Sequence, residues 1–277
     1  MDVLLKGLGI PESPRWHDGR LWFCNWVEQQ VVAVDMDGDV ETLPSPSEFL
    51  MGYSIDWLPD GTLLVTGDKV RSLRPDGSAV VHASQRANEI VVDGRGNVYL
   101  NGADFDFRGG EEPKPGYIKL LTPAGEVRQV AGDIQFPNGM VVTPDNRTLI
   151  ISESFAGRLT AFDIAADGSL SGRRVFADGL GPDGICLDAS GAVWVSTGGN
   201  EVVRVADGGE VLQRVTLGVD RAPFALALGG PEGRTLFVLT AEWRAADGMA
   251  NLKRLAGSER TGEILTMEVD VPAATHS

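Results

Sequence analysis

Short apolar segments alternate with polar turns along the whole chain, and one such arrangement recurs six times. In each repeat an apolar segment leads into a turn that contains Gly or Asn, and a second apolar segment follows. Such pairs predict β-hairpins, because tight turns favour these residues and strands favour apolar ones. The turn residues lie 35 to 50 positions apart, which is the period of a four-stranded propeller blade. The repeats span residues 14–23, 54–65, 88–100, 138–150, 183–194 and 224–237.

A second hairpin follows the first in each of the first five repeats, for example across Asp37-Gly38 and Asp76-Gly77. Two hairpins make four strands, so the pattern predicts an all-β fold, a six-bladed β-propeller with four-stranded blades. The sixth repeat has only one further strand, at 262–269, while the apolar residues 3–5 have no hairpin partner. We therefore expect the N-terminal strand to complete the last blade, which closes the ring and removes an exposed sheet edge. Residues 1–277 are predicted to form one domain.

One residue per repeat marks the point where the innermost strand of each predicted blade begins. Four of the six carry carboxylate or amide oxygens, and any one of these alone is explained by a turn that leads into a strand. Four that converge on a central channel predict a site for one hard divalent cation. Ca²⁺ is the expected ion, with Mg²⁺, Mn²⁺, Fe²⁺ or Zn²⁺ as alternatives, and the lack of His in the set disfavours zinc. The set is Glu12, Ser54, Asn88, Asn138, Asp183 and Phe224.

Charge and composition exclude several partners. The formal net charge of −15 at pH 7 argues against nucleic acid, because its phosphates would be repelled. No apolar run approaches the roughly 20 residues of a membrane-spanning helix, and the first residues lack the pattern of a signal peptide. Cys24 and Cys186 lie in apolar segments, which is typical of buried, reduced thiols. We therefore expect a cytoplasmic protein with no nucleic-acid or membrane partner, while the oligomeric state stays open.

Five motifs stand in a fixed order along the chain. They are Glu12-Ser-Pro-Arg-Trp16, Arg86-Ala-Asn-Glu89, Pro137-Asn-Gly-Met140, Pro182-Asp-Gly-Ile-Cys-Leu-Asp188 and Arg260-Thr-Gly-Glu-Ile264. In this order they resemble the family that includes senescence marker protein-30, gluconolactonases and luciferin-regenerating enzyme. The resemblance covers nearly the whole chain, and its last two motifs are specific. It implies a metal-dependent hydrolase whose direct protein ligands are Glu12, Asn138 and Asp183.

The same resemblance implies a substrate-binding group around the metal. Asn88 would contact the substrate or a metal-bound water, and Arg86 would bind polar substrate atoms. Glu112, or Glu111, would do the same from a lid, and the long insertion at 104–115 is either that lid or a solvated surface loop. The chain departs from the family at Glu89, where the family usually has Asp, and the longer side chain would either shift the geometry for proton transfer or change the substrate.

The implied reaction is hydrolysis of a lactone to its hydroxy acid. The metal would polarise the ring carbonyl, and Asp183 or Glu89 would accept a proton from the attacking water. Two other functions stay open: a phosphotriesterase or arylesterase that uses the same metal, and a calcium-binding propeller without catalysis. Several aromatic residues fall in segments that lead to the mouth of the channel, which favours an apolar or aromatic lactone or ester over a plain sugar lactone. They are Tyr53, Phe105, Phe107, Phe136, Phe155, Phe224 and Trp243.

Overall fold

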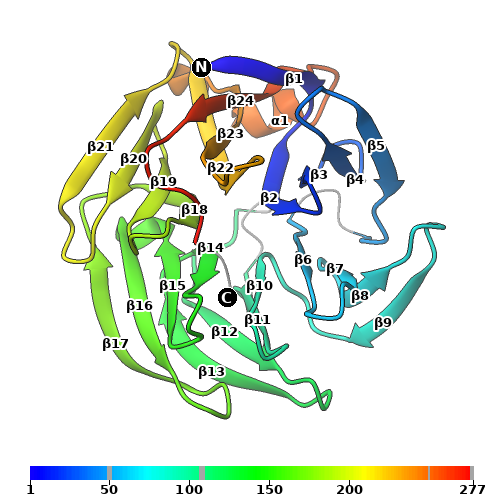
Figure 1. Cartoon of the computed structure of the whole chain (residues 1–277), viewed down its shortest axis with the longest axis vertical. Helices are drawn as coiled ribbons and strands as arrows, with labels where there is room; N and C mark the ends of the chain where they lie inside the picture. Colours follow the sequence, from blue (N-terminus) through cyan, green and yellow to red (C-terminus); the bar gives the residue numbers. More distant parts are fainter. Residues whose placement is uncertain (49–51, 106–109, 249, 275–277) are drawn as a thin grey trace.

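Six antiparallel, four-stranded sheets stand around a central channel in the computed structural model, which describes residues 1–48, 52–105, 110–248 and 250–274 (Figure 1). Each sheet is one blade, and its innermost strand lines the channel. The six-bladed propeller predicted from the repeats is therefore confirmed.

The first three blades follow one another along the chain. The first contains β2 (Pro11–His17), β3 (Arg20–Asn25), β4 (Gln30–Val34) and β5 (Val40–Pro44). The second contains β6 (Ile55–Trp57), β7 (Leu63–Val65), β8 (Val70–Leu73) and β9 (Ala79–Ala83). The third contains β10 (Ile90–Val92), β11 (Val98–Gly102), β12 (Gly116–Leu121) and β13 (Val127–Ile134).

The next two blades repeat this order, and three short helical segments interrupt the second half of the chain. The fourth blade contains β14 (Pro137–Val142), β15 (Thr148–Glu153), β16 (Arg158–Ile164) and β17 (Leu170–Ala177). The fifth contains β18 (Pro182–Leu187), β19 (Val193–Thr197), β20 (Glu201–Val205) and β21 (Val211–Thr216). The helical segments are η1 (Ser154–Ala156), η2 (Ala245–Asp247) and α1 (Ala250–Leu255).

The sixth blade joins the two ends of the chain. It contains β22 (Arg221–Gly229), β23 (Thr235–Glu242), β24 (Gly262–Glu268) and β1 (Asp2–Leu8). The N-terminal strand β1 pairs antiparallel with β24, with Asp2 opposite Thr266, and so forms the outer edge of this blade. This confirms the predicted closure of the ring by the N-terminal strand. The closure ties the last blade to the first, since β1 leads directly into β2.

The hydrophobic core lies between neighbouring blades. One cluster joins Tyr99 and Ile118 of the third blade to Met140 and Leu149 of the fourth. The second strands are buried on both faces because each blade packs against two neighbours, and every residue of β11 is buried. Cys24 and Cys186, at 0% and 9% exposure, are free thiols in such clusters, as their sequence context predicted. This packing fixes the innermost strands relative to one another.

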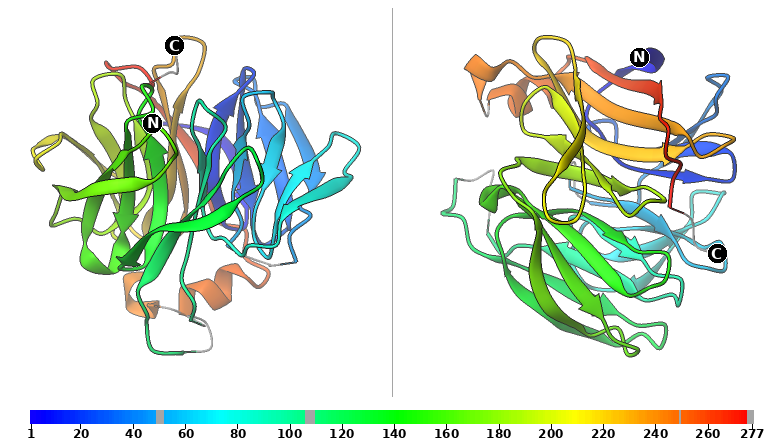
Figure 2. Two further views of the ribbon diagram at one scale, coloured as in Figure 1. Left: turned by 90° about the horizontal axis from the view of Figure 1, so that it is seen from below. Right: turned by 60° about the vertical axis from the view of Figure 1, so that its left-hand side comes forward.

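The propeller has two different faces. The innermost strands begin at what we call the mouth face and run to hairpin turns on the opposite, turn face. Helix α1 and the segment after β11 project together from one face, and the C-terminal segment lies on the other (Figure 2, left). No helix in the described part of the chain is long and apolar enough to cross a membrane.

The segment after β24 crosses the turn face. Ala189 donates a backbone hydrogen bond to the carbonyl oxygen of Pro272 (2.8 Å), and Ala274 donates one to that of Leu187 (3.1 Å). Ala273 and Ala274 line the channel cavity, so this segment lies across the end of the channel that is distant from the mouth.

Candidate functional site

The predicted ligand positions coincide with irregularities in the innermost strands. Strand register shifts between Glu12 and Arg15 in the first blade, and similar shifts flank the predicted ligands of the fourth and fifth blades. Bulges of this kind redirect side chains and are common beside active sites. Here they occur where β2, β14 and β18 carry Glu12, Asn138 and Asp183.

Two glycines allow these strands to approach one another closely. A Cβ atom at Gly139 would lie 2.8 Å from the backbone nitrogen of Ile185 and 2.9 Å from the carbonyl oxygen of Asp183. At Gly184 it would lie 2.5 Å from the Cα atom of Ala225 in the next blade. Both glycines follow a predicted ligand directly in sequence, so their lack of a side chain brings neighbouring ligands together.

Glu12, which is buried, and Asp183, which is partly exposed, form a pair of carboxyl groups at the mouth. Burial, followed by the negative charges of Asp183 and Glu89, raises the pKa of Glu12 well above its usual range. Burial and the charge of Glu89 raise the pKa of Asp183 to about 7, although a hydrogen bond from the Asn138 side chain lowers it in part. The neighbouring charges that act on this pair are therefore negative. Asp183 acts on Glu12 and accepts a hydrogen bond from Asn138, so the three predicted ligands lie close together.

Glu89 is held by a separate group of side chains beneath this pair. Its Oε1 accepts a short hydrogen bond from the Ser13 hydroxyl, and its Oε2 accepts one from the Ser54 hydroxyl (3.0 Å). The Nη2 atom of Arg15 lies 3.7 Å from Oε2, and Arg15 also lies 3.6 Å from the Asp56 carboxylate. Burial raises the pKa of Glu89, while Arg15 and the two serines oppose that rise. Both Glu89 oxygens are thus engaged by protein donors.

Asn101 connects the third and fourth blades at the mouth. This fully buried side chain donates a hydrogen bond from Nδ2 to the carbonyl oxygen of Asn138 (2.6 Å). The backbone carbonyl oxygen of Asn101 accepts the backbone N–H of Asn88 (2.9 Å), so the same residue contacts both Asn138 and Asn88. Sequence reasoning missed Asn101, Ser13 and Arg15. Asn101 could have been found as an Asn inside an apolar strand. Ser13 could have been found because it directly follows Glu12, whereas a glycine follows Asn138 and Asp183.

The other predicted substrate-binding residues lie toward solvent. Arg86 is exposed, and its charge lowers the pKa of the Tyr117 phenol, which burial and Asp104 raise overall. Arg86 therefore lies near Tyr117 at the base of the 104–115 insertion. Glu112 is exposed as well, while Glu111 forms an ion pair with Lys114. Neither glutamate is buried with Glu12 and Asp183.

The predicted aromatic residues divide into three groups. Tyr53 is fully buried between the first and second blades, with its hydroxyl 3.1 Å from the carbonyl oxygen of Gln30, so it belongs to the core. Phe224 and Trp243 pack edge to face against each other, and both contact the cluster that contains Leu255 of α1. Phe107 lies outside the described residues. The third group, at the mouth between the third and fourth blades, is Phe105, Phe136 and Phe155.

Glu12, Asn138 and Asp183 fit a hard divalent cation. Two carboxylates and one amide supply oxygen atoms, which are the donors that Ca²⁺ and Mg²⁺ prefer. Burial and neighbouring negative charges raise the pKa of both carboxyl groups, and a cation would stabilise their ionised forms. Within the described ranges, no three His, Cys, Asp or Glu side chains gather as a ligand cluster. A cation here would therefore need the Asn138 amide as well as the two carboxylates.

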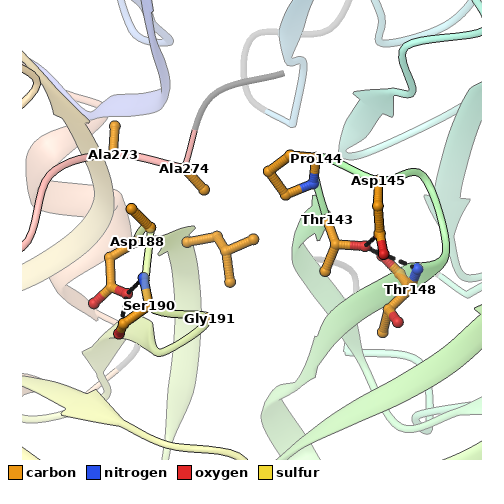
Figure 3. A pocket seen from close by; sticks show the side chains of 11 residues that line it. Thr143, Pro144, Asp145, Thr148, Asp188, Ser190, Gly191, Ala273 and Ala274 are labelled. Carbon is orange, nitrogen blue, oxygen red and sulfur yellow. Dashed lines mark hydrogen bonds between the residues drawn. The ribbon is translucent and has the colours of Figure 1, made fainter. Parts of the chain in front are cut away.

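The turn face carries a cavity of about 450 Å³ between the fourth and fifth blades and the C-terminal segment (Figure 3). Its acidic groups already have partners. Asp188 accepts a hydrogen bond from Arg204 (2.6 Å), and Asp145 accepts one from the Thr143 hydroxyl (2.7 Å). The predicted ligands Glu12, Asn138 and Asp183 lie together at the mouth instead, so the mouth is the candidate site.

Comparison with known proteins gives relatives over nearly the full chain. The pentonolactonase XacC of Haloferax volcanii is 28% identical over 272 residues, covering 92% of this chain and 87% of that protein. A 6-deoxy-6-sulfogluconolactonase of Pseudomonas putida is 33% identical over 260 residues, covering 87% of each.

Solved structures show the same fold. A luciferin-regenerating enzyme aligns with a TM-score of 0.82 at 19% identity, covering 98% of this chain and 95% of that one. The gluconolactonase XC5397 of Xanthomonas campestris aligns with a TM-score of 0.71 at 25% identity, covering 85% and 84%. Residues 10–242 match the SMP-30/Gluconolactonase/LRE-like region. On this match and the 33% identity to the sulfogluconolactonase, the chain belongs to the SMP-30/gluconolactonase/LRE-like family.

Proposed function

We propose that the protein is a lactonase that depends on a divalent cation, Ca²⁺ being the ion that its oxygen donors suit best. The observation that carries this proposal is the gathering of Glu12, Asn138 and Asp183 at the mouth of the channel, where burial and neighbouring negative charges raise the pKa of both carboxyl groups. The names of the two curated relatives, a pentonolactonase and a sulfogluconolactonase, support lactones as the substrate class.

Glu12, Asn138 and Asp183 would hold the cation, which when bound supplies a Lewis acid for the ester carbonyl. Asp183 is the proposed general base, because it is partly exposed at the mouth while both Glu89 oxygens accept hydrogen bonds from serines. A water molecule attacks the carbonyl carbon and passes a proton to Asp183. The ring C–O bond then breaks, and the leaving oxygen takes that proton, so the product is the hydroxy acid.

Glu89 is proposed to act as a positioning residue. Its two serine hydrogen bonds and the neighbouring Arg15 hold its charge in place beside Glu12. Asn88, fixed through Asn101, and the exposed Arg86 are proposed to bind polar atoms of the substrate. Glu112 would join them only if the 104–115 segment moved toward the mouth, since it is exposed.

The test is a lactone panel on metal-stripped protein. Ca²⁺, Mg²⁺, Mn²⁺, Zn²⁺ and Fe²⁺ are each titrated against gluconolactone, xylonolactone, dihydrocoumarin and a phosphotriester. Ring opening should require a cation and fall at least about 100-fold in Asp183→Asn, because a base and ligand are lost together. Asp207→Asn, the same substitution at an exposed residue of the fifth blade, should leave the rate unchanged.

Other outcomes select the alternatives. Faster cation-dependent turnover of the phosphotriester than of any lactone would replace the lactonase by a phosphotriesterase. Cation binding with no turnover above the Asp183→Asn level would favour a calcium-binding propeller without catalysis.

A further inference from the structure

Phe136 and Phe155, which we call the phenylalanine pair, stack at the mouth face. Their ring centroids lie 4.3 Å apart with an interplanar angle of 16°. Phe105, with 7% of its surface exposed, lies behind Phe136 at a centroid distance of 6.1 Å. Offset stacking of this kind is a favourable geometry for aromatic rings.

The backbone that carries the pair is unusual for bulky residues. Phe136 has a φ of +58°, in the left-handed region that aromatic residues rarely adopt. The carbonyl oxygen of Phe136 accepts the N–H of Ser154 (3.1 Å), and that of Gln135 accepts the N–H of Phe155 (3.1 Å). The buried Glu153 accepts a further hydrogen bond from the Gln135 N–H (2.8 Å). Strained residues persist where such contacts hold them, and they cluster at ligand-binding sites.

The phenylalanine pair lies beside the proposed ligands. Phe136 precedes Asn138 by two residues at the beginning of the fourth blade. The hydroxyl of Ser154, which precedes Phe155, donates a hydrogen bond to the carbonyl oxygen of Pro182 (2.7 Å), next to Asp183. The pair is thus linked along the chain to Asn138 and, through the Ser154 hydroxyl, to the residue that precedes Asp183.

Phe155 also differs from the other exposed apolar side chains. It is 52% exposed and is the one aromatic residue among the large hydrophobic residues that are exposed in the described part of the chain. Val80, Val81, Val175 and Val211 are exposed on outer strands, far from the innermost strands of their blades. Single exposed apolar residues are ordinary. A stacked pair in which Phe136 has a left-handed backbone and Phe155 is exposed is a different arrangement.

We infer that the phenylalanine pair is a subsite for a flat aromatic group of the substrate, so that the preferred lactones carry an aryl ring. This inference rests on the proposed lactonase function and names its substrate class. An aryl group would stack on the exposed Phe155 ring while its ester carbonyl points toward Glu12, Asn138 and Asp183. Polyhydroxylated lactones would gain little from the same surface, because their hydroxyl groups favour water or hydrogen-bonding partners.

The experiment compares two substrates in four proteins. kcat and KM are measured for dihydrocoumarin and gluconolactone in the wild type, Phe155→Ala, Phe155→Leu and Val175→Ala. Phe155→Ala should raise KM for dihydrocoumarin about tenfold, because one aromatic contact contributes about 0.5–1.5 kcal/mol beyond the buried area. KM for gluconolactone should change less than about twofold. Phe155→Leu keeps an apolar side chain without a ring, so its KM for dihydrocoumarin should lie between those of the wild type and Phe155→Ala.

A binding measurement separates this inference from the proposed reaction. Saturation-transfer NMR follows 3-(2-hydroxyphenyl)propanoate, the product of dihydrocoumarin, and gluconate on the calcium-loaded protein. Aryl protons should receive saturation in the wild type and in Val175→Ala but lose most of it in Phe155→Ala. That result in a protein without turnover would keep the subsite and reject the lactonase. Equal KM changes for both substrates, or unchanged aryl binding in Phe155→Ala, would overturn the subsite and leave the reaction untouched.

Discussion

Buried carboxyl groups occur at two places on the mouth face, and the charges that surround them are of opposite sign. Glu153, at the end of β15, is fully buried and lies 3.0 Å from guanidinium nitrogens of both Arg158 and Arg173. Burial would raise its pKa, but hydrogen bonds from Thr160, the Gln135 N–H and Arg173 outweigh burial and leave the pKa lowered. Glu12 and Asp183 instead have raised pKa values, and the charges that act on them are negative.

Glu153 is thus an acid group that stabilises the fold, whereas Glu12 and Asp183 are the acid groups of the candidate site. Glu153 finds its positive charge within the protein, since two arginines from its own blade supply it. Glu12 and Asp183 come from the first and fifth blades, and the charge of Asp183 acts on Glu12. An acid pair without a positive partner in the described part of the protein binds protons more tightly, and the proposed cation would replace these protons. The three predictions that follow test this contrast.

The largest effect is expected when each carboxylate is neutralised in metal-free protein. Glu153→Gln should lower the free energy of unfolding by about 3 kcal/mol, because it leaves two arginines without their buried partner. Glu12→Gln should leave it unchanged or raise it, since one of two repelling charges disappears. Urea unfolding at pH 7.5 in the presence of a chelator measures both. Equal destabilisation by the two variants would contradict the contrast.

The pH dependence of stability should also have opposite signs at the two places. The pKa of Asp183 rises from 3.8 to about 7 on folding, so the folded protein binds the extra proton more tightly. That stability is complete below about pH 4 and is lost as the pH rises through 7. Glu153, whose pKa is lowered, contributes above its ordinary value of 4.5 and loses its contribution in acid.

Thermal unfolding of metal-free protein between pH 5 and 8 measures the contribution of the carboxyl groups at the mouth to stability. The wild type should become less stable as the pH rises across this range, and Asp183→Asn should show a flatter profile. Saturating Ca²⁺ should remove the slope, because the bound cation replaces the protons. A profile of the metal-free wild type that rises toward pH 8 would show that these carboxyl groups are not proton-binding in the folded state.

The smallest effect concerns the support of Glu89. Ser13 has a φ of +50° and donates its hydroxyl to Glu89. Ser13→Ala should destabilise the protein by about 1–2 kcal/mol, because it leaves a buried carboxylate oxygen without its donor. Ser13→Gly loses the same donor but removes the strain of the left-handed region, so it should be more stable than Ser13→Ala by about 1 kcal/mol. Chemical unfolding measures the stability of both variants. A Ser13→Gly variant that is less stable than Ser13→Ala would contradict this account.

The fold was predictable because a blade is a local unit. Hairpin turns such as Asp76-Gly77 and the spacing of the repeats lie within short stretches of sequence. The unpaired N-terminal strand also followed from counting strands, and β1 pairs with β24 as expected. Within the candidate site, only the proximity of Glu12, Asn138 and Asp183 was predictable, because each stands at the same point of its repeat.

The partners of these residues were not predictable because they come from other blades. The contact of Ser13 with Glu89 spans 76 positions, and no local pattern marks it. Tyr53 was placed at the mouth by its position in sequence, yet it is buried in the core. The left-handed backbone of Phe136 is equally invisible to periodicity, because glycine is the residue that usually signals a positive φ.

Calorimetric titration of Ca²⁺ into metal-stripped protein tests the central claim, that Glu12, Asn138 and Asp183 form a cation site. The variants are Glu12→Gln, Asp183→Asn and, as the matched buried carboxylate, Glu153→Gln. We predict one tight site in the wild type, an affinity at least about 100-fold weaker in Glu12→Gln and Asp183→Asn, and an affinity within about threefold of wild type in folded Glu153→Gln. Binding that is unchanged in Glu12→Gln or Asp183→Asn would contradict the claim.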